Sequence, residues 1–135
     1  MPDAAGGAIL APMARPSRDL SEHPYLAELR KLSASLPETA EVEAWGHPTF
    51  RAGKKIFATF GEHEGAPSIG VKQTRPDQTA LVGDGRFFVP PYVGQHGWVG
   101  VRVDEVPWPL VADLVERSYR LVALKRMLRA LDGEG

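Results

Sequence analysis

Hydrophobic and polar residues alternate late in the chain with the period of two that is typical of an extended strand. Val99, Val101 and Val103 fall on one side of this strand. Trp98 and Arg102 fall on the other side. The valines indicate a face that packs in a core, whereas the tryptophan and the arginine indicate a face with a separate role.

Shorter stretches with the same period predict the rest of an antiparallel sheet. Glycine and proline mark reversals at 46–48 and 53–54, and the polar stretch 61–67 predicts a loop. A short strand is also expected at 86–89, in an otherwise irregular segment. The remaining strands are predicted at 41–45, 49–52, 55–60 and 68–72.

Helical spacing of apolar residues predicts three helices. Leucines recur at this spacing over 24–36, and Thr74 is a typical N-cap for a short helix that ends near residue 82. A long apolar stripe over 107–127 predicts a C-terminal helix. The order of elements predicts an α+β, two-layer fold, in which an antiparallel sheet of about five strands has helices packed on one face.

The domain organisation follows from where the periodic patterns begin and end. Residues 1–20 are rich in Ala, Gly and Pro and are expected to form a flexible N-terminal tail. Residues 21–131 are expected to form a single domain, and residues 132–135 a short C-terminal tail.

Composition narrows the classes of function. Sixteen Lys+Arg and seventeen Asp+Glu leave a net charge of −1, so any binding of nucleic acid must depend on local clusters of cations. The absence of cysteine excludes disulfides, thiolate metal sites and cysteine nucleophiles, and fits the reducing cytoplasm. No apolar run approaches the length of a membrane span, so we expect a cytoplasmic protein without a membrane partner.

Two sets of segments resemble a known family. Residues 43–51, followed by 53–58, are similar to the N-terminal signature of the MmcQ/YjbR-like family. Residues 97–101, together with 114–122, are similar to its C-terminal signature. The resemblance implies a small α+β fold, likened to the frataxin (CyaY) and secretion-chaperone folds. It also implies DNA binding of a double-wing type.

The alternation places a basic and aromatic set of side chains on the sheet face away from the helices, whereas Ile56 and the other apolar strand residues point inward. Cations that neutralise phosphates and rings that stack on bases, at roughly 1–3 kcal/mol each, are typical of a surface for single-stranded nucleic acid. In the alternative interpretation, the rings are covered by a helix or loop and the cations lie at the rim. The set comprises Arg51, Lys55, Phe57, Lys72, Trp98 and Arg102.

Two further groups of cations have two interpretations each. Lys54, with Arg51 and Lys55, would form a hairpin wing that lies along a phosphate backbone, or would protect a sheet edge from aggregation. The basic stretch 117–129 is either a second phosphate contact or a helix end that favours cations.

A small-molecule pocket between Trp98, Tyr92 and the wing is the second hypothesis. Glu43, His47 and Tyr119 would supply an acid–base group, or a Glu43–Tyr119 hydrogen bond would merely fix a helix to the sheet. The histidines show no ligand spacing, so no metal site is predicted. The candidate pocket residues are Glu43, His47, Tyr92, His96 and Tyr119.

No catalytic motif is present, and we therefore expect a binding protein without enzymatic activity or a cofactor. The leading hypothesis is a module that binds DNA or single-stranded nucleic acid through the basic and aromatic face, as a monomer or weak homodimer. The alternatives are a small-molecule or anion-binding protein and a homodimeric interaction protein that uses the same face.

Overall fold

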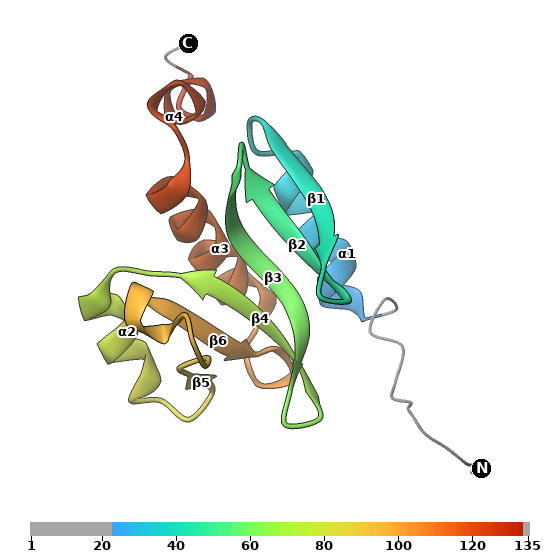
Figure 1. Cartoon of the computed structure of the whole chain (residues 1–135), viewed down its shortest axis with the longest axis vertical. Helices are drawn as coiled ribbons and strands as arrows, with labels where there is room; N and C mark the ends of the chain where they lie inside the picture. The colour runs from blue at the N-terminus through green and yellow to red at the C-terminus, as the bar shows by residue number, and fades with distance from the viewer. Residues whose placement is uncertain (1–22, 134–135) are drawn as a thin grey trace, which may run out of the picture.

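The structure, a computed structural model, describes residues 23–133 and consists of a six-stranded antiparallel sheet with four α-helices. Helices α1 (Pro24–Ala34) and α3 (Trp108–Val122) lie behind the sheet in Figure 1, on what we call its inner face. The opposite side is called the outer face. The predicted α+β, two-layer fold is confirmed. The predicted N-terminal tail lies outside the described residues.

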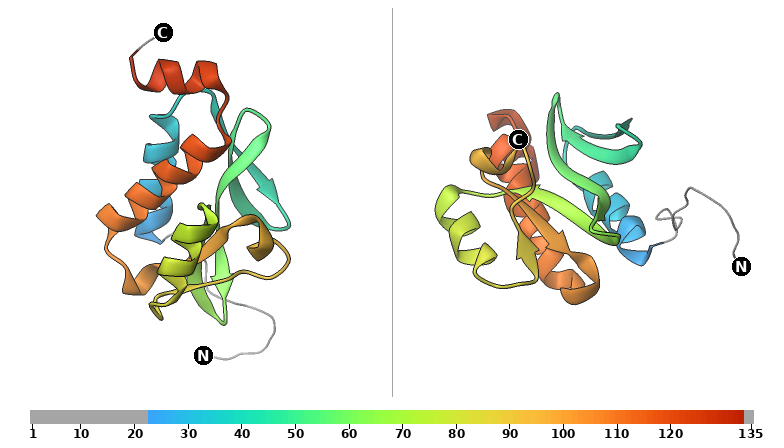
Figure 2. Two further views of the ribbon diagram at one scale, coloured as in Figure 1. Left: turned by 90° about the vertical axis from the view of Figure 1, so that its left-hand side faces the viewer. Right: turned by 60° about the horizontal axis from the view of Figure 1, so that its bottom comes forward.

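The strands follow the order β1-β2-β3-β4-β6-β5 across the sheet. Helix α2 (Arg75–Val82) packs against β5 and β6, and α4 (Lys125–Leu131) lies beyond the end of α3 (Figures 1 and 2). Two short 3-10 turns, η2 (Gly94–His96) and η3 (Val103–Glu105), flank β6. The strands are β1 (Thr39–Ala44), β2 (His47–Ala52), β3 (Lys55–His63), β4 (Ala66–Lys72), β5 (Phe87–Phe88) and β6 (Trp98–Arg102).

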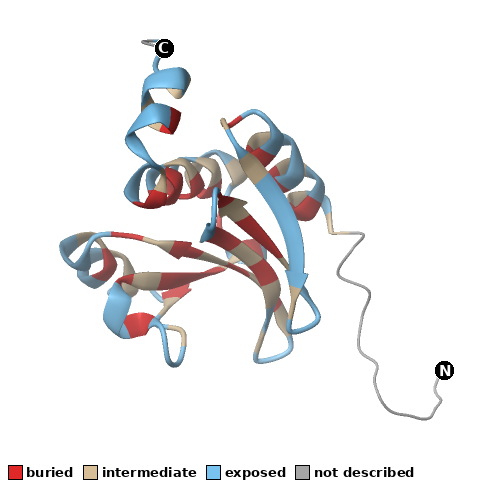
Figure 3. Ribbon diagram, turned by 45° about the horizontal axis from the view of Figure 1, so that its top comes forward, coloured by how far each residue is buried: buried red, intermediate tan, exposed pale blue. Residues whose placement is uncertain are grey.

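The core lies between the inner face and helices α1 and α3, as the red residues in Figure 3 show. Cross-strand pairing aligns Phe60, Ile69 and Val101 in one row, and all three side chains are buried. Leu29 of α1 and Leu114 of α3 pack against this face. The alternation therefore predicts the inner face correctly for the central strands.

A β-bulge in β3 reverses that alternation near the start of the strand. Phe50 pairs with Ala58 but Arg51 pairs with Ile56, so Phe57 has no partner on β2. Phe57 consequently turns inward, is fully buried, and its ring meets that of Tyr119 at 5.4 Å. The predictions that Phe57 points outward and Ile56 inward are wrong, because an inserted residue leaves no trace in the alternation.

Tight hairpin turns join β1 to β2 and β3 to β4. They consist of Trp45–Gly46 and Glu64–Gly65, and both residues of each turn have positive φ, as in a type I′ turn. The turn predicted at 46–48 therefore lies earlier, and His47 already belongs to β2. The loop predicted at 61–67 is wrong, because the two strands continue almost to the turn.

Ser118 of α3 joins two strands that diverge beside the bulge. Its hydroxyl donates a hydrogen bond to the Phe57 carbonyl oxygen at 2.6 Å and accepts one from the Lys72 backbone N–H at 2.8 Å. The side chain thus occupies a place where a backbone hydrogen bond would otherwise link β3 to β4. Because Ser118 is fully buried, these bonds also satisfy polar groups that water cannot reach.

The predicted C-terminal helix is divided into two. Helix α3 ends at Val122, and extended backbone at Ala123 and Leu124 precedes α4. The change of direction lets Met127 bury its side chain, whose Cε lies close to Gly53 at the tip of the β2–β3 hairpin. A continuous helix would instead carry this apolar stripe past the end of the sheet into solvent, which is why the single-helix prediction fails.

Candidate functional site

The outer face carries a pocket of about 330 Å³ above strands β2, β3, β4 and β6. The β1–β2 hairpin and the chain that follows β5 border it, and no α-helix contributes to its lining. The lining residues are Ala44, Trp45, His47, Thr49, Thr59, Phe60, Gly61, Glu62, His63, Ser68, Gly70, Phe88, Pro90, Pro91 and Gly100.

Three glycines and a threonine form much of the pocket floor. Thr59, Gly70 and Gly100 are cross-strand neighbours on β3, β4 and β6, and Gly61 lies one step along β3. A Cβ added to Gly100 would lie 2.1 Å from the Phe88 ring, so the ring can rest on this strand only because glycine is there. The glycines therefore let the side chains of Phe88, Thr59 and His47 lie close against the sheet, and these side chains line the pocket.

The wall next to β5 is aromatic and partly charged. The His63 ring stacks on Phe88 with centroids 3.7 Å apart and an interplanar angle of 12°. The Arg102 guanidinium lies 5.1 Å from the Phe88 centroid, pairs with Glu64 at 3.5 Å and donates to the Gly85 carbonyl oxygen. The Arg102 guanidinium therefore makes its contacts within the protein. It supports the Phe88 wall and is not a free cation for a ligand.

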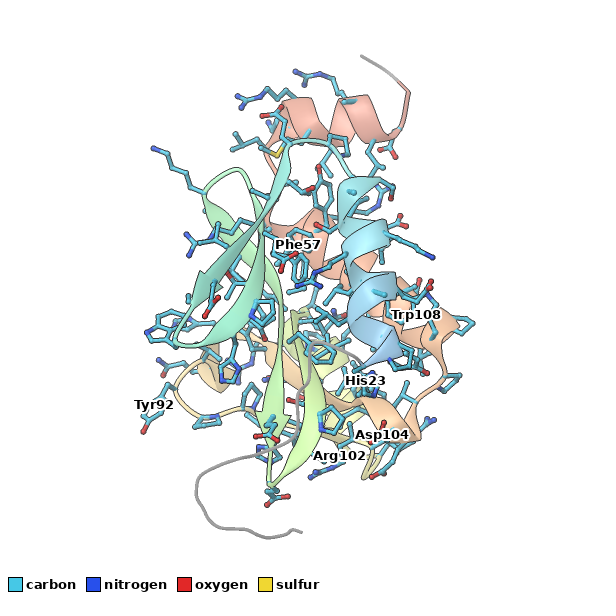
Figure 4. The ribbon with its side chains drawn as sticks, turned by 90° about the vertical axis from the view of Figure 1, so that its right-hand side faces the viewer. His23, Phe57, Tyr92, Arg102, Asp104 and Trp108 are labelled. Atoms are coloured by element: carbon cyan, nitrogen blue, oxygen red, sulfur yellow. The ribbon has the colours of Figure 1, made fainter. Side chains whose placement is uncertain are left out.

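Two exposed aromatic residues lie at the border of this region. Trp45 is 85% exposed and lines the pocket from the β1–β2 turn. Tyr92 is 94% exposed, but it lines a separate, shallower depression together with Pro90 and Gly94, and its side chain points into solvent in Figure 4. Of the residues predicted for a pocket, His47 therefore lines the main one and Tyr92 does not.

Arg51, Lys72 and Trp98 continue the outer face beside the pocket. Arg51 shares a face with its partner Ile56, and Lys72 is paired with Trp98, whose ring lies 3.8 Å from the position of a Cβ on Gly70. Neither Arg51 nor Lys72 forms an ion pair with another residue of 23–133. The Arg51 Nε is buried without a hydrogen-bond partner there.

The predicted basic and aromatic set is thus only partly assembled. Lys54 and Lys55 are exposed at the tip of the β2–β3 hairpin. Lys55 pairs with the buried Ala52, which places it toward the inner side rather than beside Arg51. Phe57 belongs to the core. Arg51, Lys72, Trp98 and Arg102 keep the predicted face.

The predicted acid–base group does not form. The Tyr119 hydroxyl donates to the Pro37 carbonyl oxygen at 2.6 Å on the inner side, and burial raises the pKa of this phenol, with a further contribution from Glu38. Glu43 is exposed on β1, and His96 lies in η2, outside the lining of the main pocket. The hydrogen bond proposed between Glu43 and Tyr119 is therefore replaced by one to the backbone.

Sequence reasoning missed the pocket floor and its aromatic wall. A signal was present, because Gly70 and Gly100 interrupt otherwise regular strands on the predicted outer face. Glycine inside a strand marks a close approach of other atoms, here those of Thr59 at Gly70 and those of Phe88 at Gly100. The pairing of His63 with Phe88 had no such signal, since it depends on strand register.

Within the described range 23–133, no group of three or more His, Cys, Asp or Glu side chains has the arrangement of a metal site. The same residues include no helix that is both long enough and apolar enough to cross a bilayer.

Comparisons with known proteins place the chain among relatives of similar fold. The sequence model of the YjbR family matches residues 34–121. A crystal structure of protein DR2400 from Deinococcus radiodurans, with a DUF419 domain, is similar with a TM-score of 0.66 and 20% identity, over 79% of this chain and 87% of that one. A Pseudomonas syringae protein of a structural genomics project has a TM-score of 0.59 and 14% identity, over 70% and 96%. No curated protein matches.

Proposed function

The chain belongs to the YjbR family, and we propose that it is a binding module without enzymatic activity that holds single-stranded nucleic acid on the outer face of its sheet. The observation that carries this proposal is the pocket with a glycine floor and an aromatic wall, which opens on the same face as Arg51 and Lys72. In this proposal the protein requires no cofactor and acts as a monomer or weak homodimer.

The pocket fits the base of a single strand better than a base pair. An unpaired base presents a flat face that stacks on aromatic side chains, at about 1–3 kcal/mol per base. The stacked His63 and Phe88 rings, which line the pocket beside the low floor of strands β3 and β4, offer such a place. Bases in a duplex are held in their own stack and would have to be extruded to enter.

The cations of the outer face are suited to the phosphates next to that base. Arg51 and Lys72 have no acidic partner among residues 23–133, so their charges are available. Glu62 lines the pocket near the β3–β4 turn, at the end of the pocket away from Arg51 and Lys72, and would repel phosphates there. Glu64 in that turn is paired with Arg102. With two or three phosphates engaged, the logarithm of affinity should fall with a slope of about −1.4 to −2.1 against the logarithm of salt concentration.

The test is a titration of fluorescently labelled single-stranded and duplex oligonucleotides, followed by anisotropy at low and moderate salt. We expect the single strand to bind more tightly, with the shallow salt slope given above. Arg51→Gln combined with Lys72→Gln should weaken binding and reduce the slope by about 1.4. Lys31→Gln on α1, whose lysine pairs with Glu28 on the helix side, is the matched control and should bind as the unmodified protein does.

Equal binding by the double variant would contradict the assignment of the phosphate contacts. The absence of any binding at low salt would contradict the proposal as a whole.

A free planar small molecule is a second candidate. The volume of about 330 Å³ lies at the small end of the range for small-molecule sites, roughly 300–1,000 Å³, and would hold one compact ligand. A thermal-shift screen of nucleosides and other aromatic heterocycles distinguishes the two candidates, because a bound ligand raises the unfolding temperature. Stabilisation by a heterocycle, without binding of oligonucleotides, would favour this second function.

A further inference from the structure

Trp45 occupies a position that its side chain disfavours. It is the first of the two residues that form the β1–β2 turn, with a φ of 54°, and Gly46 follows with a φ of 80°. Turns of this kind favour Asn, Asp or Gly at the first position, because bulky residues are strained at positive φ. A tryptophan here therefore costs stability in the turn itself.

The surroundings of Trp45 do not offset this cost. Its side chain is 85% exposed, so little of the indole is removed from water. No aromatic or cation–π contact of Trp45 occurs within residues 23–133. Strained residues of this kind are concentrated at binding sites, where the conformation serves the ligand.

The β3–β4 turn has the same backbone geometry as the β1–β2 turn but carries no aromatic ring. Glu64 has a φ of 53° and Gly65 a φ of 81°, values almost identical to those of the first turn. Glu64 gains a partner within the protein, since its carboxylate pairs with Arg102. Trp45 has the same backbone strain and no comparable partner, although it lies at the opening of the pocket.

We infer that Trp45 is the clamp of the outer-face pocket, whose indole closes on one flat ring held above the glycine floor. This inference rests on the proposed function and sharpens it: the ligand inserts a single unstacked base, with Trp45 on one side of the pocket and the His63–Phe88 pair on the other. The indole then gains in the complex the contacts that it lacks in the free protein.

The clamp predicts a preference for flat aromatic rings. An indole stacks on any base because every base has a π face, so the contact is tolerant of sequence. Selection among bases is left to the polar groups of the floor and the rim, where Thr59 and Ser68 contribute hydroxyls and His47 a ring nitrogen. Acyclic aliphatic ligands offer no comparable flat face to Trp45.

Substitutions of Trp45 distinguish the effect of the indole ring on binding from the effect of the backbone strain on stability. Trp45→Asn removes the indole and introduces a residue that tolerates positive φ, so the thermal midpoint should stay the same or rise. Affinity for a labelled oligothymidylate at low salt should fall about tenfold or more. Trp45→Phe, which keeps an aromatic face, should stay within about threefold of the unmodified protein.

Glu64→Asn is the matched control in the other turn. It relieves the same backbone strain and removes no ring, but it also removes the carboxylate that pairs with Arg102, so its midpoint should rise less than that of Trp45→Asn. Its affinity should not decrease, because Arg102 keeps its hydrogen bond to the Gly85 carbonyl oxygen beside Phe88. Phe88→Leu tests the opposite wall of the pocket and should weaken binding.

The outcomes distinguish the clamp from the proposed function. If Trp45→Asn binds oligothymidylate normally while Phe88→Leu binds weakly, the clamp is wrong and the proposed function stands. A lower thermal midpoint in Trp45→Asn would show that the indole serves the fold, which also overturns the clamp. If the unmodified protein does not bind at all, both the clamp and the proposed function fail.

Discussion

The two faces of the central strands differ in how far side chains fill the space above them. On the inner face, Ile69 and Val71 of β4 are fully buried and fill the space below the helices. On the outer face of the same strand, Ser68 and Gly70 leave space, and that space becomes the pocket. Alternation along one strand thus separates the residues that stabilise the fold from those that form the site.

This separation has a consequence for mutations. Side chains on the inner face are tightly packed, and their loss leaves a cavity that the core cannot easily close. Small residues on the outer face contribute little burial, and changes there alter the shape of the pocket first. Stability and binding should therefore respond to different substitutions on the same strand.

The largest expected effect comes from truncating the inner face. Ile69→Ala should reduce the free energy of unfolding by about 2–5 kcal/mol, the usual cost of removing most of a buried isoleucine. Urea denaturation measures this quantity. The neighbour Ser68→Ala, on the outer face, should change it by less than about 0.5 kcal/mol. Equal losses in the two variants would contradict the division between the faces.

The next test alters the outer face without touching the core. Gly100→Ala places a methyl group where the Phe88 ring now lies, so the ring must move and its stack with His63 is lost. We expect a change in unfolding free energy of less than about 1 kcal/mol, because alanine favours the strand while the ring pair is lost. Binding of single strands should weaken about tenfold. Gly85→Ala, where an added Cβ meets nothing within 4 Å, is the control.

The smallest effect concerns two ion pairs that connect α4 to the rest of the protein, Glu38–Arg126 and Asp132–Arg120. A hydrogen bond from Arg126 lowers the pKa of Glu38, and one from Arg120 lowers the pKa of Asp132. Because both pKa values are lower in the folded protein, these pairs stabilise α4 at neutral pH. That contribution decreases as the pH falls below about 4.5, the ordinary pKa of Glu38.

Amide hydrogen exchange in α4 should consequently accelerate in acid before exchange in the central strands does. Arg126→Gln should show faster exchange in α4 already at neutral pH. An unchanged exchange rate in that variant would mean that Met127 and the Arg120–Asp132 pair hold the helix in place without Arg126.

The sequence predicts the inner face well because burial imposes a period that the residues must obey. The three valines of the last strand stretch illustrate this, as all three are buried. Thr74 caps α2 as expected, with its hydroxyl accepting the Asp77 backbone N–H. The bulge at Phe57 was not predictable, since Lys55–Phe60 alternates whether or not one residue is left unpaired.

The outer face is harder to predict because nothing forces a pattern on residues that face solvent. Arg51, Lys72 and Trp98 were assigned to it correctly from alternation alone. The pocket depends on which residues lie side by side, and register determines that: Gly70 meets Gly100 only through the pairing of β4 with β6. The break before α4 was missed because no proline or glycine marks it.

Ser118 ties the helix layer to the sheet at the point where the β3–β4 pairing ends. Beside the bulge, β3 and β4 are joined through a hydroxyl of α3 instead of through backbone alone. The backbone pairing of the two strands runs from Ala58 to His63 on β3, and Ser118 extends the connection by one further position from the helix layer. Ser118→Ala would therefore leave the Phe57 carbonyl oxygen and the Lys72 backbone N–H without this partner, beside the residue that carries a cation to the outer face. One hydroxyl of α3 thus serves both layers of the fold.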